Sequence, residues 1–221
     1  MNIMNKKYLN VSIFFWLSFI VASASFILFP QIDIYVSNLF YDGKSFFSNG
    51  TILEEIFYYS VKPLLFTLTL GVFFIYLFNK IKKRNILNIN AKVLLYILLV
   101  VGIAPGLIVN ATFKENWERA RPSQIILYGG NKEFTPAFVM SDQGGYSFSS
   151  GHAAAAFSLF GFALLAVKRR TFWIWMSLSY GLLVSVARVA AGGHFFSDVI
   201  TSFFIVYIFT QFFYSLILKK D

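Results

Sequence analysis

The sequence predicts an all-α integral membrane protein, a single domain over residues 1–221 built as a bundle of six transmembrane helices. Two observations predict this fold. Hydrophobic residues make up 57% of the 221 residues and charged residues only 13%, whereas an ordinary soluble domain has about 25% charged residues. The apolar residues also gather in uncharged runs close to the length of about 20 residues that a helix needs to cross a bilayer.

Six runs qualify as spans, at about residues 11–29, 61–79, 93–113, 150–167, 171–190 and 197–218. The third contains Pro105 and Gly106, so we expect a kink there, with neighbouring helices satisfying the freed backbone groups. The segment 31–62 is long, and towards its end Ile52, Ile56, Phe57 and Tyr58 lie beside Glu54 and Glu55. A short helix in the membrane interface and a plain connecting loop are both compatible with it.

The first run has a second interpretation. Lys6 and Lys7 precede it and Ala22-Ser23-Ala24 lies towards its end, an arrangement typical of a signal peptide with its cleavage site. Because Phe26–Phe29 continues the apolar run past that site, we expect an uncleaved span.

The distribution of basic residues predicts the orientation, since Lys and Arg concentrate on the cytoplasmic side of a membrane protein. Most of the 19 lie near the two termini or in the connections 80–92 and 168–170. Both termini should therefore be cytoplasmic, and the segments 30–62, 114–152 and 188–198 should face outward. The net charge of +9 is then mainly a signal of topology, and we predict no nucleic-acid partner. The absence of cysteine excludes disulfides and thiolate metal sites.

A first cluster of polar residues follows the third span. Lys114, Arg119 and Arg121 are three cations within eight residues. They can surround a phosphate, with Lys as a point charge and Arg as a two-pronged donor. A basic loop that contacts lipid headgroups would have the same composition.

A second cluster, Ser149-Ser150-Gly151-His152, opens the fourth span. Ser is a good N-cap, and the free N–H groups at a helix N-terminus attract anions. His152 in the first turn can reach an oxygen bound there. A plain helix cap with an interfacial histidine explains the same residues equally well.

A third cluster joins the last two spans, with Arg188 followed by His194 and then Asp198. If the sixth helix begins near His194, then His194 and Asp198 lie four residues apart on one face. The carboxylate can then hold one imidazole nitrogen and leave the other free to attack. A helix-capping acid that satisfies a neighbouring histidine is the alternative.

The combination favours a catalytic site. The chain has only two histidines, both lie in these clusters, and the predicted topology places all three clusters at the same outward end. Ionisable groups at membrane depth are costly and usually functional, so three unrelated structural explanations would have to coincide.

The motifs Lys-(six residues)-Arg-Pro, Ser-Gly-His and Arg-(five residues)-His-(three residues)-Asp, in this order between Lys114 and Asp198, resemble the type 2 phosphatidic acid phosphatase superfamily. Two positions depart from its pattern, which usually has Pro at the place of Ser149 and Ser at the place of Ala187. Neither replaces a group with a direct chemical role, so we expect activity to survive, with weaker phosphate contacts at Ala187.

The resemblance implies a phosphatase that needs neither a metal nor another cofactor. His194 would be the nucleophile and form a phosphohistidine, Asp198 would orient it, and His152 would protonate the leaving oxygen and then activate water. The phosphoryl oxygens would be held by Lys114, Arg121, Ser150, Gly151 and Arg188. This agrees with the chemistry of phosphoryl transfer, which depends mostly on positioning and charge stabilisation.

Within the family, the stretch Lys114–Pro122 is similar to bacterial lipid A phosphatases. This implies a phosphorylated membrane lipid as substrate, namely lipid A at its 4′- or 1-phosphate, with the 4′ position favoured. The reaction would take place on the periplasmic face of the bacterial inner membrane, without a required protein partner.

Other functions stay open, because the motifs contact phosphate and not the rest of the lipid. Undecaprenyl pyrophosphate, phosphatidylglycerol phosphate and phosphatidic acid are alternative substrates, and transfer of the phosphoryl group to a second lipid would use the same site. A transporter with an outward phosphate-binding vestibule is the alternative from another class. It would place ionisable or broken segments near the membrane midplane, whereas here the ionisable groups gather at one end.

Overall fold

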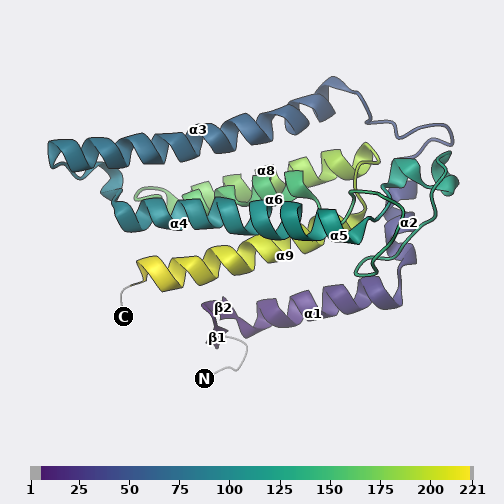
Figure 1. Ribbon diagram of the computed structural model, residues 1–221, viewed down its shortest axis with the longest axis horizontal. Coiled ribbons are helices and arrows are strands. Elements are labelled where there is room, and N and C mark those ends of the chain that lie inside the picture. Colours follow the sequence, from purple (N-terminus) through teal and green to yellow (C-terminus); the bar gives the residue numbers. More distant parts are fainter. Residues whose placement is uncertain (1–5, 220–221) are drawn as a thin grey trace.

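Helices dominate the computed structural model, which describes residues 6–219 (Figure 1). In chain order the elements are β1 (Lys7–Tyr8), β2 (Val11–Ser12), α1 (Ile13–Leu28), α2 (Gln31–Asn38), α3 (Ile52–Lys82), η2 (Ile86–Asn88), α4 (Ala91–Val101), η3 (Gly102–Lys114), α5 (Glu115–Trp117), η4 (Pro122–Gln124), η5 (Ile126–Tyr128), α6 (Gly151–Phe157), α7 (Leu159–Ala163), α8 (Arg170–Ala190), α9 (Phe196–Phe213) and η6 (Tyr214–Leu218). The two short strands pair antiparallel ahead of α1.

The described residues contain four helical stretches that are long and apolar enough to cross a membrane, Ile52–Lys82, Ala91–Gln124, Arg170–Ala190 and Phe196–Leu218. The helices α1 and α2 add a fifth if they count as one broken span, bent by 87°. The chain is therefore a multi-pass membrane protein, and the predicted number of six spans is not confirmed. The fourth expected span, 150–167, is a helical segment over Gly151–Ala163, which is about 20 Å long at 1.5 Å per residue and too short for a bilayer.

The break between α1 and α2 has a local cause. Pro30 disfavours a helical conformation in the residue before it, and Phe29 adopts φ −128° and ψ 63°, so α1 ends at Leu28. The chain then turns sharply into α2, whose first turn contains the buried Asp33. The sequence did not predict this second helix.

The helix α3 begins earlier than predicted. Thr51 caps it, with its hydroxyl accepting a hydrogen bond from the Glu54 backbone N–H at 3.4 Å, and the helix runs without interruption past Pro63 to Lys82. Residues 52–60 are helical, as one of the two interpretations of the segment 31–62 expected, but they are the first turns of α3 and not a separate short helix. At 31 residues this helix exceeds the length that crosses a bilayer, so its ends extend beyond the apolar layer.

Where we expected a kink at Pro105, the helix changes instead from the α to the wider π form. The π-helical segment η3 contains Pro105 and ends at Lys114. The Asn110 side chain donates a hydrogen bond to the Pro105 carbonyl at 2.5 Å.

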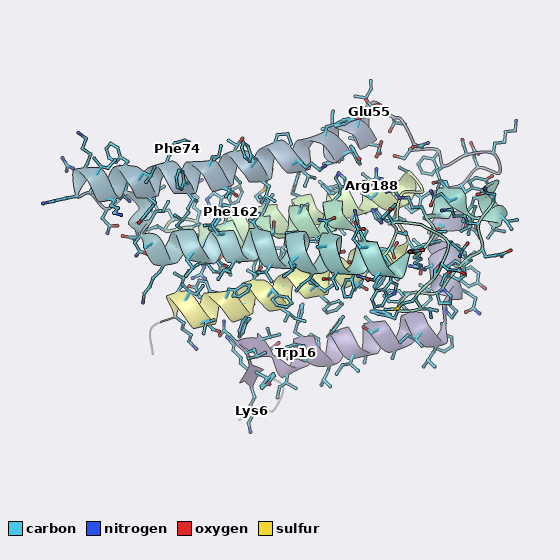
Figure 2. All side chains as sticks on the ribbon, in the orientation of Figure 1. Lys6, Trp16, Glu55, Phe74, Phe162 and Arg188 are labelled. Carbon is cyan, nitrogen blue, oxygen red and sulfur yellow. The ribbon has the colours of Figure 1, made fainter. Side chains whose placement is uncertain are left out.

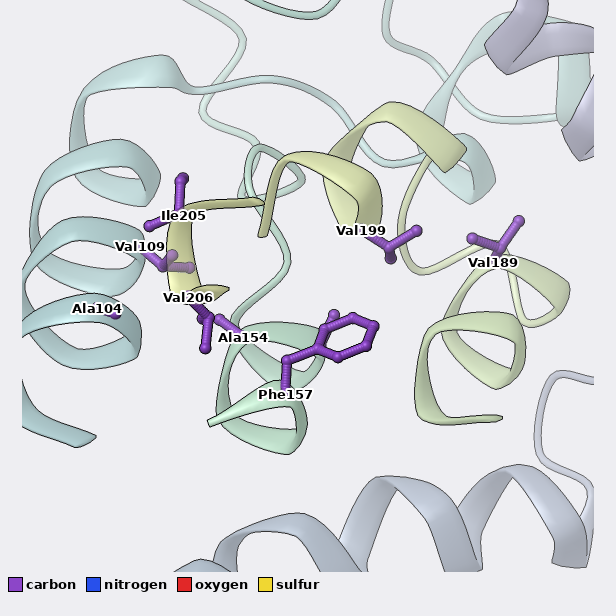
Figure 3. Close-up of a cluster of buried hydrophobic side chains, with 9 residues drawn as sticks. Ala104, Val109, Ala154, Phe157, Val189, Val199, Ile205 and Val206 are labelled. Atoms are coloured by element: carbon purple, nitrogen blue, oxygen red, sulfur yellow. The ribbon is translucent and has the colours of Figure 1, made fainter. Parts of the chain in front are cut away.

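Small residues bring the central helices close together. Four successive alanines follow His152 in α6, and Gly181 of α8 leaves room for Phe157, whose ring would lie 2.3 Å from a Cβ at that glycine. Phe157 belongs to a buried cluster with residues of η3, α8 and α9 (Figure 3). This kind of close contact between small residues is typical of helices in membranes.

The polar parts of the chain gather at one end of the bundle. In Figure 1, α2 and α5 lie at the same end as the start of α9, whereas β1 and the C-terminal end of α9 lie at the other. The connection between α5 and α6 also packs there, as the Tyr128 hydroxyl donates to Asn38 of α2 at 2.8 Å. The three clusters predicted from the sequence therefore meet at this end.

Candidate active site

Three of the eight predicted site residues line a small cavity. A cavity of about 260 Å³ lies between α3, η3 and α6, and its lining includes Lys62, Lys114, Gly151 and His152. A larger groove of about 460 Å³ is lined by α2, α6, α8 and α9, and its side chains are apolar except for Ser185. We place the site in the smaller cavity because it alone of the two contains titratable groups.

The first turn of α6 presents His152 to this cavity. Ser150 is the N-cap, as predicted, and its hydroxyl accepts a hydrogen bond from the Ala153 N–H at 3.4 Å. A Cβ at Gly151 would lie 2.5 Å from the Asn110 Oδ1 and 3.0 Å from the Lys114 Nζ. Glycine is therefore required for Lys114 to approach the backbone. In the described part of the chain, His152 Nε2 is buried without a hydrogen-bond partner.

The last turn of α8 contributes Arg188, which is buried (Figure 2). Its Nη1 pairs with Glu54 of α3, and its Nη2 lies where a Cβ at Gly193 would be only 2.2 Å away. Among residues 6–219, the Nε of Arg188 has no hydrogen-bond partner. An unpaired buried donor is costly, so this atom is a candidate to bind a phosphoryl oxygen.

His194 lies directly before α9, whose N-cap is Phe195 and whose first residue is Phe196, so the helix begins near His194 as expected. Its Nδ1 is 2.8 Å from the Ser147 carbonyl oxygen and 3.7 Å from the Asp198 Oδ2. A carbonyl only accepts, so Nδ1 carries the proton and the lone pair is on Nε2. Burial lowers the pKa of His194 to about 4, against the opposing effect of Asp198, so the ring is neutral at pH 7.

Asp198 is fully buried in the first turn of α9 and has several donors. Its Oδ1 accepts from Arg119 at 2.6 Å, and its Oδ2 accepts from the Ser147 hydroxyl at 2.6 Å and the Phe195 N–H at 2.8 Å. Ser147 thus contacts Asp198 through its side chain and His194 through its carbonyl. This bridging role could not be predicted from the sequence, because a serine in a loop has no distinctive pattern.

Arg119 does not face the cavity, which corrects the expectation that three cations surround a phosphate. Its side chain is fully buried, and its Nη2 pairs with Asp33 of α2 at 2.8 Å while its Nη1 pairs with Asp198. The Nε donates to the Thr135 carbonyl at 2.7 Å. Asp33 also accepts from the backbone and hydroxyl of Ser197.

The other cations remain near the cavity. Lys114 ends η3 and lines it, and Arg121 lies within electrostatic range of both Lys114 and Arg188. Lys62, which the sequence analysis did not single out, lines the cavity from α3. Its spacing of four residues from Tyr58 and eight from Glu54 was a usable signal, but only once that segment is known to be helical.

In residues 6–219, no group of three or more His, Cys, Asp or Glu side chains is placed to hold a metal ion. The lining of the cavity instead includes Lys62, Lys114 and His152, and Arg121 and Arg188 lie within electrostatic range of Lys114.

Comparison with known proteins identifies the family. The PAP2 superfamily profile matches residues 91–221, which include all three motifs. The chain belongs to the PAP2 superfamily. It is 34% identical over 210 residues to a lipid A 4′-phosphatase of Francisella tularensis subsp. novicida, covering 88% of this chain and 90% of that protein.

Two further relatives carry the same name. The lipid A 4′-phosphatase of Rhizobium leguminosarum is 29% identical, with 80% of this chain and 83% of that protein covered. The one from Rhizobium etli is 30% identical, with 80% and 75% covered. No solved structure matches the chain. As a PAP2 member with phosphatases as relatives, the protein is a phosphoric monoester hydrolase.

Proposed function

We propose that this protein removes the 4′-phosphate of lipid A, without a metal ion, on the periplasmic face of the bacterial inner membrane. The observation that carries the proposal is that a neutral, buried His194 occurs in the same site as His152 and Arg188. Each of these two has a buried nitrogen without a hydrogen-bond partner among residues 6–219. The chain is also a relative of lipid A 4′-phosphatases. The 4′ position follows from the names of those relatives.

In the first step, the Nε2 lone pair of His194 attacks phosphorus, and the bond from phosphorus to the sugar oxygen breaks. The bound phosphate dianion favours the protonated form of His152, which gives this proton to the leaving oxygen, so that the dephosphorylated lipid leaves as a neutral alcohol. Arg188 and the neighbouring Lys114 and Arg121 stabilise the charge on the phosphoryl oxygens, which is the main task of a protein in this chemistry. Ser150 and Gly151 let those oxygens approach the backbone of α6.

In the second step, His152 takes a proton from water, which attacks the phosphohistidine and releases inorganic phosphate. His194 recovers its lone pair. The hydrogen bond to the Ser147 carbonyl at 2.8 Å favours the same tautomer throughout, and the Asp198 carboxylate at 3.7 Å stabilises the positive charge that develops on the ring.

The test is phosphate release from purified lipid A in detergent with EDTA, by the wild type and by His194→Ala, with the product identified by mass spectrometry. We expect release by the wild type alone, with loss from the 4′ position and a phosphorylated intermediate on His194. Release of only the 1-phosphate, or hydrolysis of undecaprenyl pyrophosphate with lipid A untouched, would refute the proposed substrate.

The periplasmic location has a separate test. The chain has no cysteine, so single cysteines introduced at the exposed Lys44 and at Lys82 can be labelled in intact cells with a membrane-impermeant reagent. We expect labelling at position 44 only, and labelling at position 82 only would reverse the proposed orientation.

A further inference from the structure

The first turns of α3 form a wall of the site that none of the family motifs includes. Glu54 and Tyr58 are four residues apart, so their side chains lie on the same face of the helix. Glu54 pairs with Arg188, and the Tyr58 ring contacts both Arg188 and His152. Two neighbouring side chains of one helix therefore hold two residues that the proposed reaction uses.

Glu54 fixes the direction of the Arg188 guanidinium. Both residues are buried, with 7% and 8% of their surface exposed, and a buried charge needs a partner. The pairing occupies Nη1 and the backbone of Gly193 confines Nη2. The Arg188 Nε has no hydrogen-bond partner among residues 6–219. The pairing with Glu54 therefore determines which edge of the guanidinium group remains free and where it points.

Tyr58 fixes the plane of the His152 ring. The two rings stack with centroids 4.2 Å apart and planes at 25°. The Arg188 Cζ lies 4.7 Å from the centroid of the same Tyr58 ring, within the range of a cation–π contact. The Tyr58 ring thus contacts both the phosphate-binding Arg188 and the proton donor His152, and it fixes their positions relative to each other.

We propose that Glu54 and Tyr58 are positioning residues of the phosphatase site, which act through Arg188 and His152 and do not contact the substrate. The inference rests on the proposed function. It has a specific consequence for Glu54, because a carboxylate beside the phosphate site repels a phosphate ion. Removing the charge of Glu54 should leave the affinity for phosphate in the ground state intact. It should reduce only the stabilisation of the transition state, in which alignment matters most.

The structure offers matched control residues on the same turns. Glu55 and Tyr59 follow Glu54 and Tyr58 directly and are exposed, Tyr59 at 66%. Figure 2 shows Glu55 on the outer side of α3 and Arg188 between this helix and the rest of the bundle. Glu55→Gln therefore makes the same chemical change as Glu54→Gln away from the site. Tyr59→Leu keeps Tyr58 and removes only the neighbouring ring that packs edge-on against it, with centroids 5.0 Å apart.

The experiment compares kcat and KM on the lipid phosphate that the wild type hydrolyses best, together with the binding of inorganic phosphate and of orthovanadate, which resembles the transition state. For Glu54→Gln we expect kcat and vanadate affinity to fall about 100-fold, with phosphate affinity equal to or above that of the wild type. Tyr58→Leu should lower kcat and change its pH profile, and Tyr58→Phe, which keeps the ring, should recover most of that loss.

Two outcomes would overturn the inference. One is a Glu54→Gln enzyme whose kcat lies within about twofold of Glu55→Gln, which means that Arg188 needs no partner. The other is a parallel loss of phosphate affinity, vanadate affinity and melting temperature, which means that Glu54 only stabilises the fold. Inactivity of the wild type on lipid A would refute the proposed substrate alone, since the ratio of vanadate to phosphate affinity tests the positioning without turnover.

Discussion

Replacing Arg119 by Met tests whether the buried ion network is essential to the site. Met has a similar length and no charge, so the substitution keeps much of the packing and leaves two carboxylates, Asp33 and Asp198, without their shared cation. Both carboxylates are buried. We expect Arg119→Met to destabilise the protein and to abolish turnover, because Asp198 also holds Ser147 and through it His194.

The magnitude follows from the burial of the network. Removing one partner of a buried ion pair costs about 3–5 kcal/mol, because it leaves an uncompensated charge. For a protein of this size each kcal/mol lowers the melting temperature by about 2–4 °C. The expected decrease for Arg119→Met is therefore about 6–20 °C. Adding Asp33→Asn removes one of the two orphaned charges, so the double variant should recover part of that loss.

Thermal unfolding in detergent, followed by phosphate release at a temperature where each variant is folded, measures both effects. Lys132→Met is the matched control, since Lys132 makes no ion pair in residues 6–219. A melting temperature for Arg119→Met within about 2 °C of this control, or no gain on adding Asp33→Asn, would show that the network does not carry the stability that its geometry indicates.

Three further predictions concern the cavity. Gly151→Ala places a methyl group 2.5 Å from the Asn110 Oδ1 and 3.0 Å from the Lys114 Nζ, so both side chains must shift and KM should rise about tenfold. Arg188→Lys keeps the charge and loses the planar fork, so kcat/KM should fall about 100-fold. The acid limb of the pH–rate profile should lie near pH 4, because burial lowers the pKa of His194 to about 4 and only the neutral ring attacks. Asp198→Asn removes an effect that raises this pKa, so any residual activity should extend to lower pH; a limb near pH 6.5 would contradict the assignment.

The sequence predicted the elements whose signals are local. The apolar runs 171–190 and 197–218 are the helices α8 and α9 with η6, since length and hydropathy alone identify such helices. A serine N-cap at Ser149 or Ser150 was also predicted, and Ser150 takes this position, because the preference for serine there comes from a hydrogen bond within one turn. The motifs identified the family because their order and spacing are specific in combination.

The sequence could not predict the contacts that join distant segments. Composition does not distinguish a cation that faces phosphate from one that faces carboxylates, and Arg119 is of the second kind because Asp33, 86 residues away, lies beside it. The roles of Glu54 and Tyr58 were not predicted, because neither a short interfacial helix nor a loop places their segment at the start of a long helix beside Arg188. The span over 150–167 was overestimated because its uncharged run, 153–167, is only 15 residues long.

The number of carboxylate partners of each cation in the site determines whether that cation can bind phosphate. Arg119 has two carboxylate partners within 2.8 Å, so its charge is already paired and its role is to stabilise the fold. Arg188 has one, Glu54, which leaves part of its guanidinium group unpaired. Lys114 has no carboxylate within ion-pair distance among residues 6–219, although it lines the cavity. The unpaired positive charge therefore increases from Arg119 through Arg188 to Lys114. We expect an entering phosphate to bind Lys114 first. Arg188 is already aligned for the transition state.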